Sequence, residues 1–173
     1  MSNFREKLHN ITTFVFDYDG VLTDGRVLLS EEGVQLRRAN VKDGYALQLA
    51  RKKGYTIAVI TGSHDKGISH RCNLLKIDNV FQGVSDKKEV FEQFISEKNI
   101  DASEVLFMGD DLPDYPIMKL AGVAACPADA SRELKDIADY ISDRRGGDAC
   151  VRDVIEQVLK VKKQWFDEDA FHW

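Results

Sequence analysis

Short apolar runs of strand length alternate along the chain with longer stretches of helical periodicity. Four runs are strongly apolar, at residues 12–16, 55–60, 104–109 and 122–126. Two shorter runs, at 79–81 and 139–141, resemble shorter strands of the same sheet. Short apolar runs flanked by turn residues are typical of parallel strands that are buried on both faces. The alternation predicts an α/β fold, a doubly wound parallel sheet of the Rossmann-like type.

Two of the intervening stretches predict helices with identifiable ends. Residues 42–54 offer Asp43 as a capping residue and end at Gly54, and residues 85–99 can be capped by Ser85 or Asp86. The second helix is expected to place an apolar stripe on one face, formed by Val90, Phe91, Phe94 and Ile95.

Residues 26–41 interrupt this alternation. They predict two short strands around the turn "SEEG", a β-hairpin inserted after the first strand at about residues 24–41. Because there is no internal repeat and no Pro/Ser-rich linker, residues 1–173 are expected to form a single domain. The C-terminal tail, about residues 164–173, lacks clear periodicity and is expected to be either frayed or docked on another surface. Its aromatic residues are Trp165, Phe166, Phe171 and Trp173.

Composition narrows the partners and the compartment. The chain is 43% hydrophobic and 31% charged, with a formal net charge of -5, which gives no electrostatic reason to expect nucleic acid or an anionic membrane as a partner. The charged N-terminus and the absence of a long apolar run predict a cytoplasmic protein with no membrane segment. Three cysteines without paired spacing argue against a disulfide framework and a structural zinc site.

Polar residues gather where the predicted strands end. They are Asp17, Asp19 and Gly20 after the first strand, Thr61, Gly62 and Ser63 after the run at 55–60, Asp110, Asp111 and Asp114 after the run at 104–109, and Lys87 at the start of a helix. In an open parallel sheet, ligands bind outside the carboxyl ends of the strands. These residues are therefore the predicted site.

The residue types in this set suit phosphoryl transfer. Carboxylate oxygens are ligands that Mg²⁺ prefers, and Mg²⁺ commonly pairs with phosphate oxygens. A lysine and a threonine hydroxyl can hold the same phosphoryl group. One aspartate could attack phosphorus to form an aspartyl phosphate, and a second, two residues further on, could donate a proton to the leaving oxygen and later take one from water.

Four segments together resemble the motifs of the haloacid dehalogenase superfamily. They are "DYDGVLTDG", "ITGS", Lys87 and "GDDLPD", in that order. The resemblance implies that Asp17 is the nucleophile and a metal ligand, and that Asp19 is the general acid/base, with its backbone carbonyl on Mg²⁺. It also implies that Asp110 completes the metal site and that Thr61 and Lys87 act at the phosphoryl group.

Several further positions follow from the same resemblance. Gly62 joins Thr61 and Lys87 in binding the substrate. Asp111 and Asp114 are expected beside the metal, without direct contact or held through water.

The spacing of the motifs leaves no room for a cap domain, because the hairpin and helices already occupy the chain between Asp17, Thr61 and Lys87. Residues 24–44 and 109–130 resemble the capless subgroup that includes 3-deoxy-D-manno-octulosonate 8-phosphate phosphatase. This resemblance implies a homotetramer in which a neighbouring subunit covers the site.

The same subgroup implies a phosphorylated 3-deoxy-2-keto sugar acid as the substrate. The first choice is 3-deoxy-D-manno-octulosonate 8-phosphate, an intermediate of lipopolysaccharide precursor synthesis, and the alternative is a nine-carbon keto acid 9-phosphate of the KDN or sialic acid type. A keto acid also needs a cation for its carboxylate, for which Arg71 is the candidate.

Two other interpretations remain open at this point. A phosphorylation receiver domain also combines aspartates, threonine, lysine and Mg²⁺ on a doubly wound sheet, although its lysine comes last in sequence, whereas Lys87 precedes the second acidic cluster. The spacing from Cys126 to Arg132 also fits the C-x5-R pattern of cysteine-dependent phosphatases, but Pro127 and Asp129 suit a phosphate-binding loop poorly.

Overall fold

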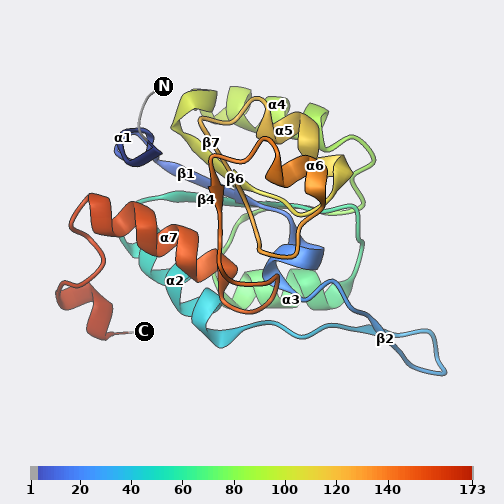
Figure 1. Ribbon diagram of the computed structural model, residues 1–173. Coiled ribbons are helices and arrows are strands. Elements are labelled where there is room, and N and C mark those ends of the chain that lie inside the picture. The colour runs from blue at the N-terminus through green and yellow to red at the C-terminus, as the bar shows by residue number, and fades with distance from the viewer. Residues whose placement is uncertain (1–3, 173) are drawn as a thin grey trace.

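The structure is a computed structural model that describes residues 4–172. Six parallel strands form one sheet in the order β5-β4-β1-β6-β7-β8 (Figure 1). The strands are β1 (Thr13–Phe16), β4 (Thr56–Ile60), β5 (Asn79–Phe81), β6 (Val105–Met108), β7 (Val123–Cys126) and β8 (Tyr140–Ile141). The predicted doubly wound α/β fold is confirmed, and each strand lies where the apolar pattern placed it.

Helices cover both faces of this sheet (Figure 1). On one side lie α1 (Phe4–Leu8), α2 (Val41–Lys52), α3 (Lys66–Leu74) and α7 (Cys150–Val161). On the other lie α4 (Lys87–Lys98), α5 (Tyr115–Met118) and α6 (Arg132–Lys135). Single-turn elements occur at η1 (Tyr18–Leu22), η2 (Ala102–Glu104), η3 (Leu112–Asp114) and η4 (Glu168–Phe171). Within residues 4–172, no helix combines the length and the apolar character needed to cross a bilayer.

The alternation of side chains along β1 explains the two layers. Phe14 and Phe16 are fully buried in the cluster under α2, α3 and α7, whereas Val15 is fully buried in the cluster under α4 to α6. Successive side chains of a strand point to opposite faces, so an unbroken apolar strand needs cover on both sides.

The start of α2 differs from the prediction. Asn40, rather than Asp43, caps this helix by accepting a hydrogen bond from the Lys42 amide at 2.9 Å. Asp43 instead lies inside the first turn, is 1% exposed, and accepts a hydrogen bond from the Arg152 amide at the start of α7 at 2.7 Å. The expected cap was therefore wrong. Ala149, the N-cap residue of α7, makes no side-chain capping bond within the described residues, and the Asp43 carboxylate accepts from an amide of the first turn of α7 instead.

At α4, Asp86 rather than Ser85 is the capping residue, and it accepts from the Glu89 amide at 3.1 Å. The predicted apolar face of this helix is confirmed. Phe91 and Phe94 are buried, and Val90 and Ile95 are partly buried against the same cluster.

The predicted hairpin is present and projects from the body of the molecule (Figure 1). Its antiparallel strands, β2 (Leu28–Leu29) and β3 (Gln35–Leu36), are joined at the base by a bridge between Thr23 and Ala39. Leu28, Leu29 and Leu36 are more than half exposed. An exposed apolar ribbon of this kind is typical of an interaction surface.

The C-terminal tail packs on α2 of the same chain up to His172. Lys53 forms ion pairs with Asp167 and Asp169, at 2.6 and 2.5 Å. The Arg152 guanidinium lies over the rings of Tyr45 and Trp165. Of the two expectations for the tail, docking is therefore correct, and the surface belongs to its own chain; Trp173 lies outside the described residues.

Candidate active site

Three neighbouring strands carry the predicted site residues to one edge of the sheet. Phe16 at the end of β1 is in register with Val59 of β4 and Met108 of β6. The Asp17 amide continues this ladder by donating to the Met108 carbonyl at 3.0 Å. Residues that follow these strands therefore meet above β1, as expected for a parallel sheet.

Lys87 joins two buried carboxylates at this edge. Its Nζ lies 2.9 Å from Oδ1 of Asp17 and 2.7 Å from Oδ1 of Asp114. The three residues are 8%, 5% and 1% exposed, respectively. Lys87 is the first residue of α4, so the helix fixes the origin of a long, flexible side chain.

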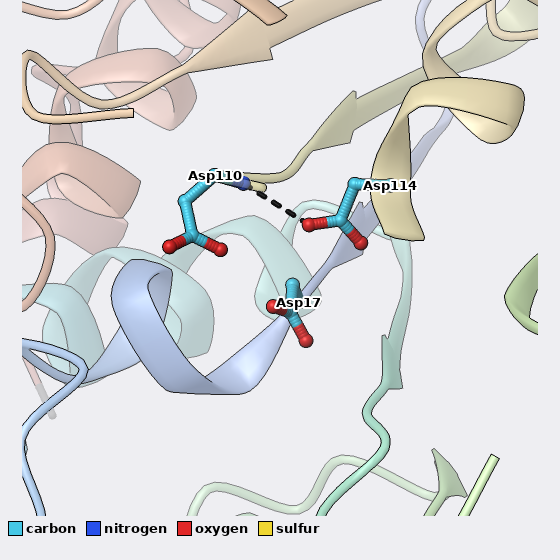
Figure 2. A group of neighbouring side chains, drawn as sticks. All are labelled: Asp17, Asp110 and Asp114. Carbon is cyan, nitrogen blue, oxygen red and sulfur yellow. Dashed lines mark hydrogen bonds between the residues drawn. The ribbon is translucent and has the colours of Figure 1, made fainter. Parts of the chain in front are cut away.

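Asp17, Asp110 and Asp114 form a group that could hold a metal ion (Figure 2). Each offers one carboxylate oxygen, and these oxygens lie within 4.8 Å of one another. Asp114 is also tied to the protein, because its Oδ2 accepts from the amides of Asp110, at 3.1 Å, and Asp111, at 3.4 Å. With Oδ1 on Lys87 as well, Asp114 is suited to holding the cluster in place.

The charges of this cluster are poorly compensated by protein groups alone. Burial and the neighbouring Asp114 raise the pKa of Asp17 to about 8, although Lys87 acts in the opposite direction. Burial, Asp114 and Asp111 raise the pKa of Asp110 to about 6. Burial disfavours the charged form of Lys87, but attraction to Asp17 and Asp114 outweighs it and raises the lysine pKa. One ammonium among several carboxylates leaves negative charge for a divalent cation to neutralise.

Gly20 allows Asp110 to approach the loop after β1. Its φ is +87°, and a Cβ at this position would lie 2.0 Å from Oδ2 of Asp110. A residue with a side chain would therefore be strained and would displace this carboxylate.

Thr61 and Gly62 lie at the end of the adjacent strand. Thr61 is 1% exposed, and its Oγ1 accepts a hydrogen bond from the Ser63 amide at 3.1 Å. Gly62 is exposed in the turn that follows β4. The turn thus places a buried hydroxyl and an exposed glycine beside the strand that carries Asp17.

Three donors hold the side chain of Asp19, which is not one of the three carboxylates grouped above. Arg37 Nε donates to Oδ1 at 2.6 Å, Ser63 Oγ donates to Oδ2 at 2.6 Å, and Thr23 Oγ1 donates to Oδ1 at 3.2 Å. Sequence reasoning missed Arg37, because an arginine of the hairpin belongs to none of the four motifs.

Arg71 donates its described hydrogen bond to the N-cap residue of α2 rather than to the acidic cluster. Its Nη2 donates to the Asn40 carbonyl at 3.3 Å, and a Cβ on Gly44 would lie 2.5 Å from this nitrogen. Arg71 also lines a cavity with Arg37 and Tyr18. Its role toward a substrate carboxylate stays a prediction.

The cysteine-dependent alternative does not fit the structure. Cys126 is fully buried at the end of β7, and burial raises the pKa of its thiol to about 11. A nucleophilic cysteine needs an accessible thiolate.

The model of a haloacid dehalogenase-like hydrolase family matches residues 76–152 of this chain. The 3-deoxy-D-manno-octulosonate 8-phosphate phosphatase KdsC of Escherichia coli (strain K12) is 36% identical over 153 residues, which span 88% of this chain and 81% of the relative.

Solved structures agree with this match. The 3-deoxy-D-manno-octulosonate 8-phosphate phosphatase of Moraxella catarrhalis, in complex with magnesium, phosphate and KDO, is 31% identical with a TM-score of 0.93, covering 99% of this chain and 97% of that one. The cobalt-bound form of the corresponding phosphatase from Haemophilus influenzae is 26% identical with a TM-score of 0.90, covering 95% and 98%.

Proposed function

Because the chain belongs to the haloacid dehalogenase-like hydrolases, in their capless subgroup, we propose that it hydrolyses 3-deoxy-D-manno-octulosonate 8-phosphate to the free sugar acid and phosphate. As a member of this group it is a phosphoric monoester hydrolase rather than a receiver domain. The observation that carries the proposal is the buried contact of Lys87 with Asp17 and Asp114, beside Asp110. We further propose that residues 1–173 act as one phosphatase domain.

In the proposed mechanism, Asp17 attacks phosphorus and forms an aspartyl phosphate. Lys87, 2.9 Å from this carboxylate, keeps it oriented and offsets charge on the phosphoryl oxygens. Asp19 donates a proton to the leaving sugar oxygen and then takes one from the water that hydrolyses the intermediate. Thr61 and Gly62 hold the phosphoryl group from the end of β4.

The predicted Mg²⁺ cofactor is supported by two observations. The relative from Moraxella catarrhalis binds magnesium, and the acidic group of this chain has the spacing and the uncompensated charge that suit a divalent cation. Asp17, Asp110 and the backbone carbonyl of Asp19 would hold the ion. When bound, Mg²⁺ would polarise the phosphoryl group and neutralise the charge that builds up on it.

The exposed hairpin supports a homotetramer in which a neighbouring subunit covers the site. We also propose that the enzyme acts in the cytoplasm, on a precursor of lipopolysaccharide. Leu28, Leu29 and Leu36 are more than half exposed, and exposed apolar side chains of this kind favour cover by another subunit. An open site also needs cover to exclude water from the reacting group.

A phosphate-release assay with Mg²⁺ tests the proposal. The substrates are 3-deoxy-D-manno-octulosonate 8-phosphate, a nine-carbon keto acid 9-phosphate and glucose 6-phosphate. We expect the octulosonate ester to have the highest kcat/KM and Asp17→Asn to abolish its turnover. Asp24→Asn, a matched change in the same loop, should stay active. Preference for the nine-carbon ester would replace the substrate, and an active Asp17→Asn enzyme would refute the mechanism.

A further inference from the structure

Asp19 receives donors from three separate segments, and one of them is the hairpin. Arg37 follows β3, Ser63 follows β4, and Thr23 lies in the loop after β1. We propose that Arg37 is a positioning residue, which together with Ser63 fixes the Asp19 carboxylate for proton transfer to the leaving sugar oxygen. This inference rests on the proposed function and adds to it a residue that lies outside the four motifs.

The guanidinium of Arg37 is fixed on several sides. Its side chain is only 8% exposed. Besides donating to Asp19, it donates from Nη2 to Ser63 Oγ at 3.3 Å and to Gln35 at 3.1 Å. Nη1 lies 3.6 Å from Asp65 and is buried, with no hydrogen-bond partner in the part of the chain that the structure describes. A planar guanidinium can bind Asp19 and Ser63 at the same time, which a lysine ammonium does less well.

Arg37 and Ser63 occupy different oxygens of the same carboxylate. Arg37 Nε is on Oδ1 and Ser63 Oγ on Oδ2, each at 2.6 Å, so the rotation of the Asp19 side chain is restricted. General acid–base catalysis depends on the position of the proton donor as well as on its chemistry. Removing Arg37 should therefore slow the step that uses Asp19 and spare steps that do not.

Arg38 provides a matched control. It is the next residue in the chain, but its side chain is 85% exposed and pairs with Asp24 at 2.6 Å. Arg37→Met and Arg38→Met thus remove the same charge from adjacent positions, one on Asp19 and one away from it.

The test compares kcat/KM for two esters with Mg²⁺ present. An alkyl ester, the sugar acid phosphate hydrolysed by the wild type, needs a proton on its leaving oxygen, whereas p-nitrophenyl phosphate does not. We expect Arg37→Met to lower kcat/KM roughly 100-fold for the alkyl ester and less than about 3-fold for the aryl ester. Arg38→Met should change neither, and Arg37→Lys should recover part of the loss.

A double mutant separates positioning from general damage. If Arg37 acts through Asp19, Arg37→Met should have little further effect on the alkyl ester in an Asp19→Asn background. Equal losses on both esters, or losses that multiply in the double mutant, would overturn the inference, and so would an Arg37→Met enzyme with wild-type kinetics. A wild type that hydrolyses no sugar acid phosphate would instead refute the proposed function.

If the thermal unfolding curve shows that Arg37→Met does not fold, Ser63→Ala is tested in its place, because it removes the other contact that fixes Asp19. Ser63→Ala should lower kcat/KM for the alkyl ester much more than for the aryl ester. Equal losses on the two esters would overturn the inference.

Discussion

Asp17 and Asp43 are two carboxylates that the fold buries to nearly the same extent, for different purposes. Asp17 is 5% exposed and Asp43 is 1% exposed. Burial raises the pKa of Asp17 to about 8 and that of Asp43 to about 6. By burial and pKa alone, either residue would qualify as a functional site.

Their neighbours distinguish them. Asp17 faces Lys87 and the carboxylates of Asp110 and Asp114, at the edge of the sheet where ligands bind. Asp43 accepts from the backbone amide of Arg152, while its Oδ2 has no hydrogen-bond partner among residues 4–172. A cluster of like charges indicates a cation or a reaction, whereas one carboxylate at a helix start indicates architecture.

The largest expected difference between the two is in catalysis. Asp17→Asn should reduce kcat on the order of 10⁴-fold or more, because an amide cannot form the covalent intermediate. Its unfolding temperature in chelator should not fall, because the variant relieves repulsion with Asp114. Asp43→Asn should keep most of the activity. A steady-state assay beside thermal unfolding checks both, and comparable losses of kcat would remove the distinction.

Metal binding gives the next largest effect. Saturating Mg²⁺ at about 100 times its Kd should stabilise the folded wild type by roughly 2.7 kcal/mol, which corresponds to a rise in Tm of about 5–10 °C. Asp110→Asn should lose this rise and Asp43→Asn should keep it, because only Asp110 belongs to the acidic group. Calorimetric scans in Mg²⁺ and in EDTA measure the shift. An unchanged rise in Asp110→Asn would place the ion elsewhere.

The pH dependence of the free energy of unfolding tests the raised pKa of Asp43. Its folded pKa of about 6 lies above the ordinary 3.8, so the folded state holds a proton that the unfolded state releases between these values. The stability linked to that proton is present below about pH 4 and is lost as the pH rises through 6. Relative to wild type, Asp43→Asn should therefore gain up to about 3 kcal/mol between pH 4 and 7.

Urea unfolding of both proteins at a series of pH values measures this difference. Glu89→Gln, at a solvent-facing position in the first turn of α4, serves as a control and should show a smaller change. A difference between wild type and Asp43→Asn that does not vary with pH would mean that Asp43 is ionised in the folded state throughout.

The apolar pattern predicted the fold well because the sheet is buried on both faces. Val15, Phe14 and Phe16 need cover from two layers, and only a doubly wound arrangement supplies it. The cap of α2 could not be predicted, since Asn40 and Asp43 are equally good local candidates. The choice between them depends on α7, more than 100 residues further along the chain.

The acidic cluster could be predicted for a similar reason. Asp17 and Thr61 directly follow strands and Asp110 follows β6 after one glycine, so the fold alone brings them together. Arg37 could not be predicted, because its contact with Asp19 depends on the path of the chain at the base of the hairpin. Residues fixed by strand order are visible in sequence, whereas residues fixed by the path of an insertion are not.

The smallest expected effect concerns the tail, which extends the α2–α7 region and leaves the acidic cluster untouched. Lys53 pairs with Asp167 and Asp169, and Tyr45 donates to the Ala170 carbonyl. Trp165 and Ala170 also pack against the core, so the Lys53 ion pairs are one part of what holds the tail. Ion pairs of this kind contribute little and are screened by salt. Lys53→Met should lower Tm by about 1–2 °C at low salt and less at 1 M salt, with kcat unchanged.

Lys88→Met is the matched control, because Lys88 is paired at the surface with Glu92 at 3.7 Å, away from the tail. It should change Tm less than Lys53→Met at low salt. Amide hydrogen exchange of residues 164–172 should rise in Lys53→Met and stay at the wild-type level in Lys88→Met. A fall in kcat in Lys53→Met would show instead that the tail communicates with the acidic cluster, although Lys53 lies at the C-terminal end of α2.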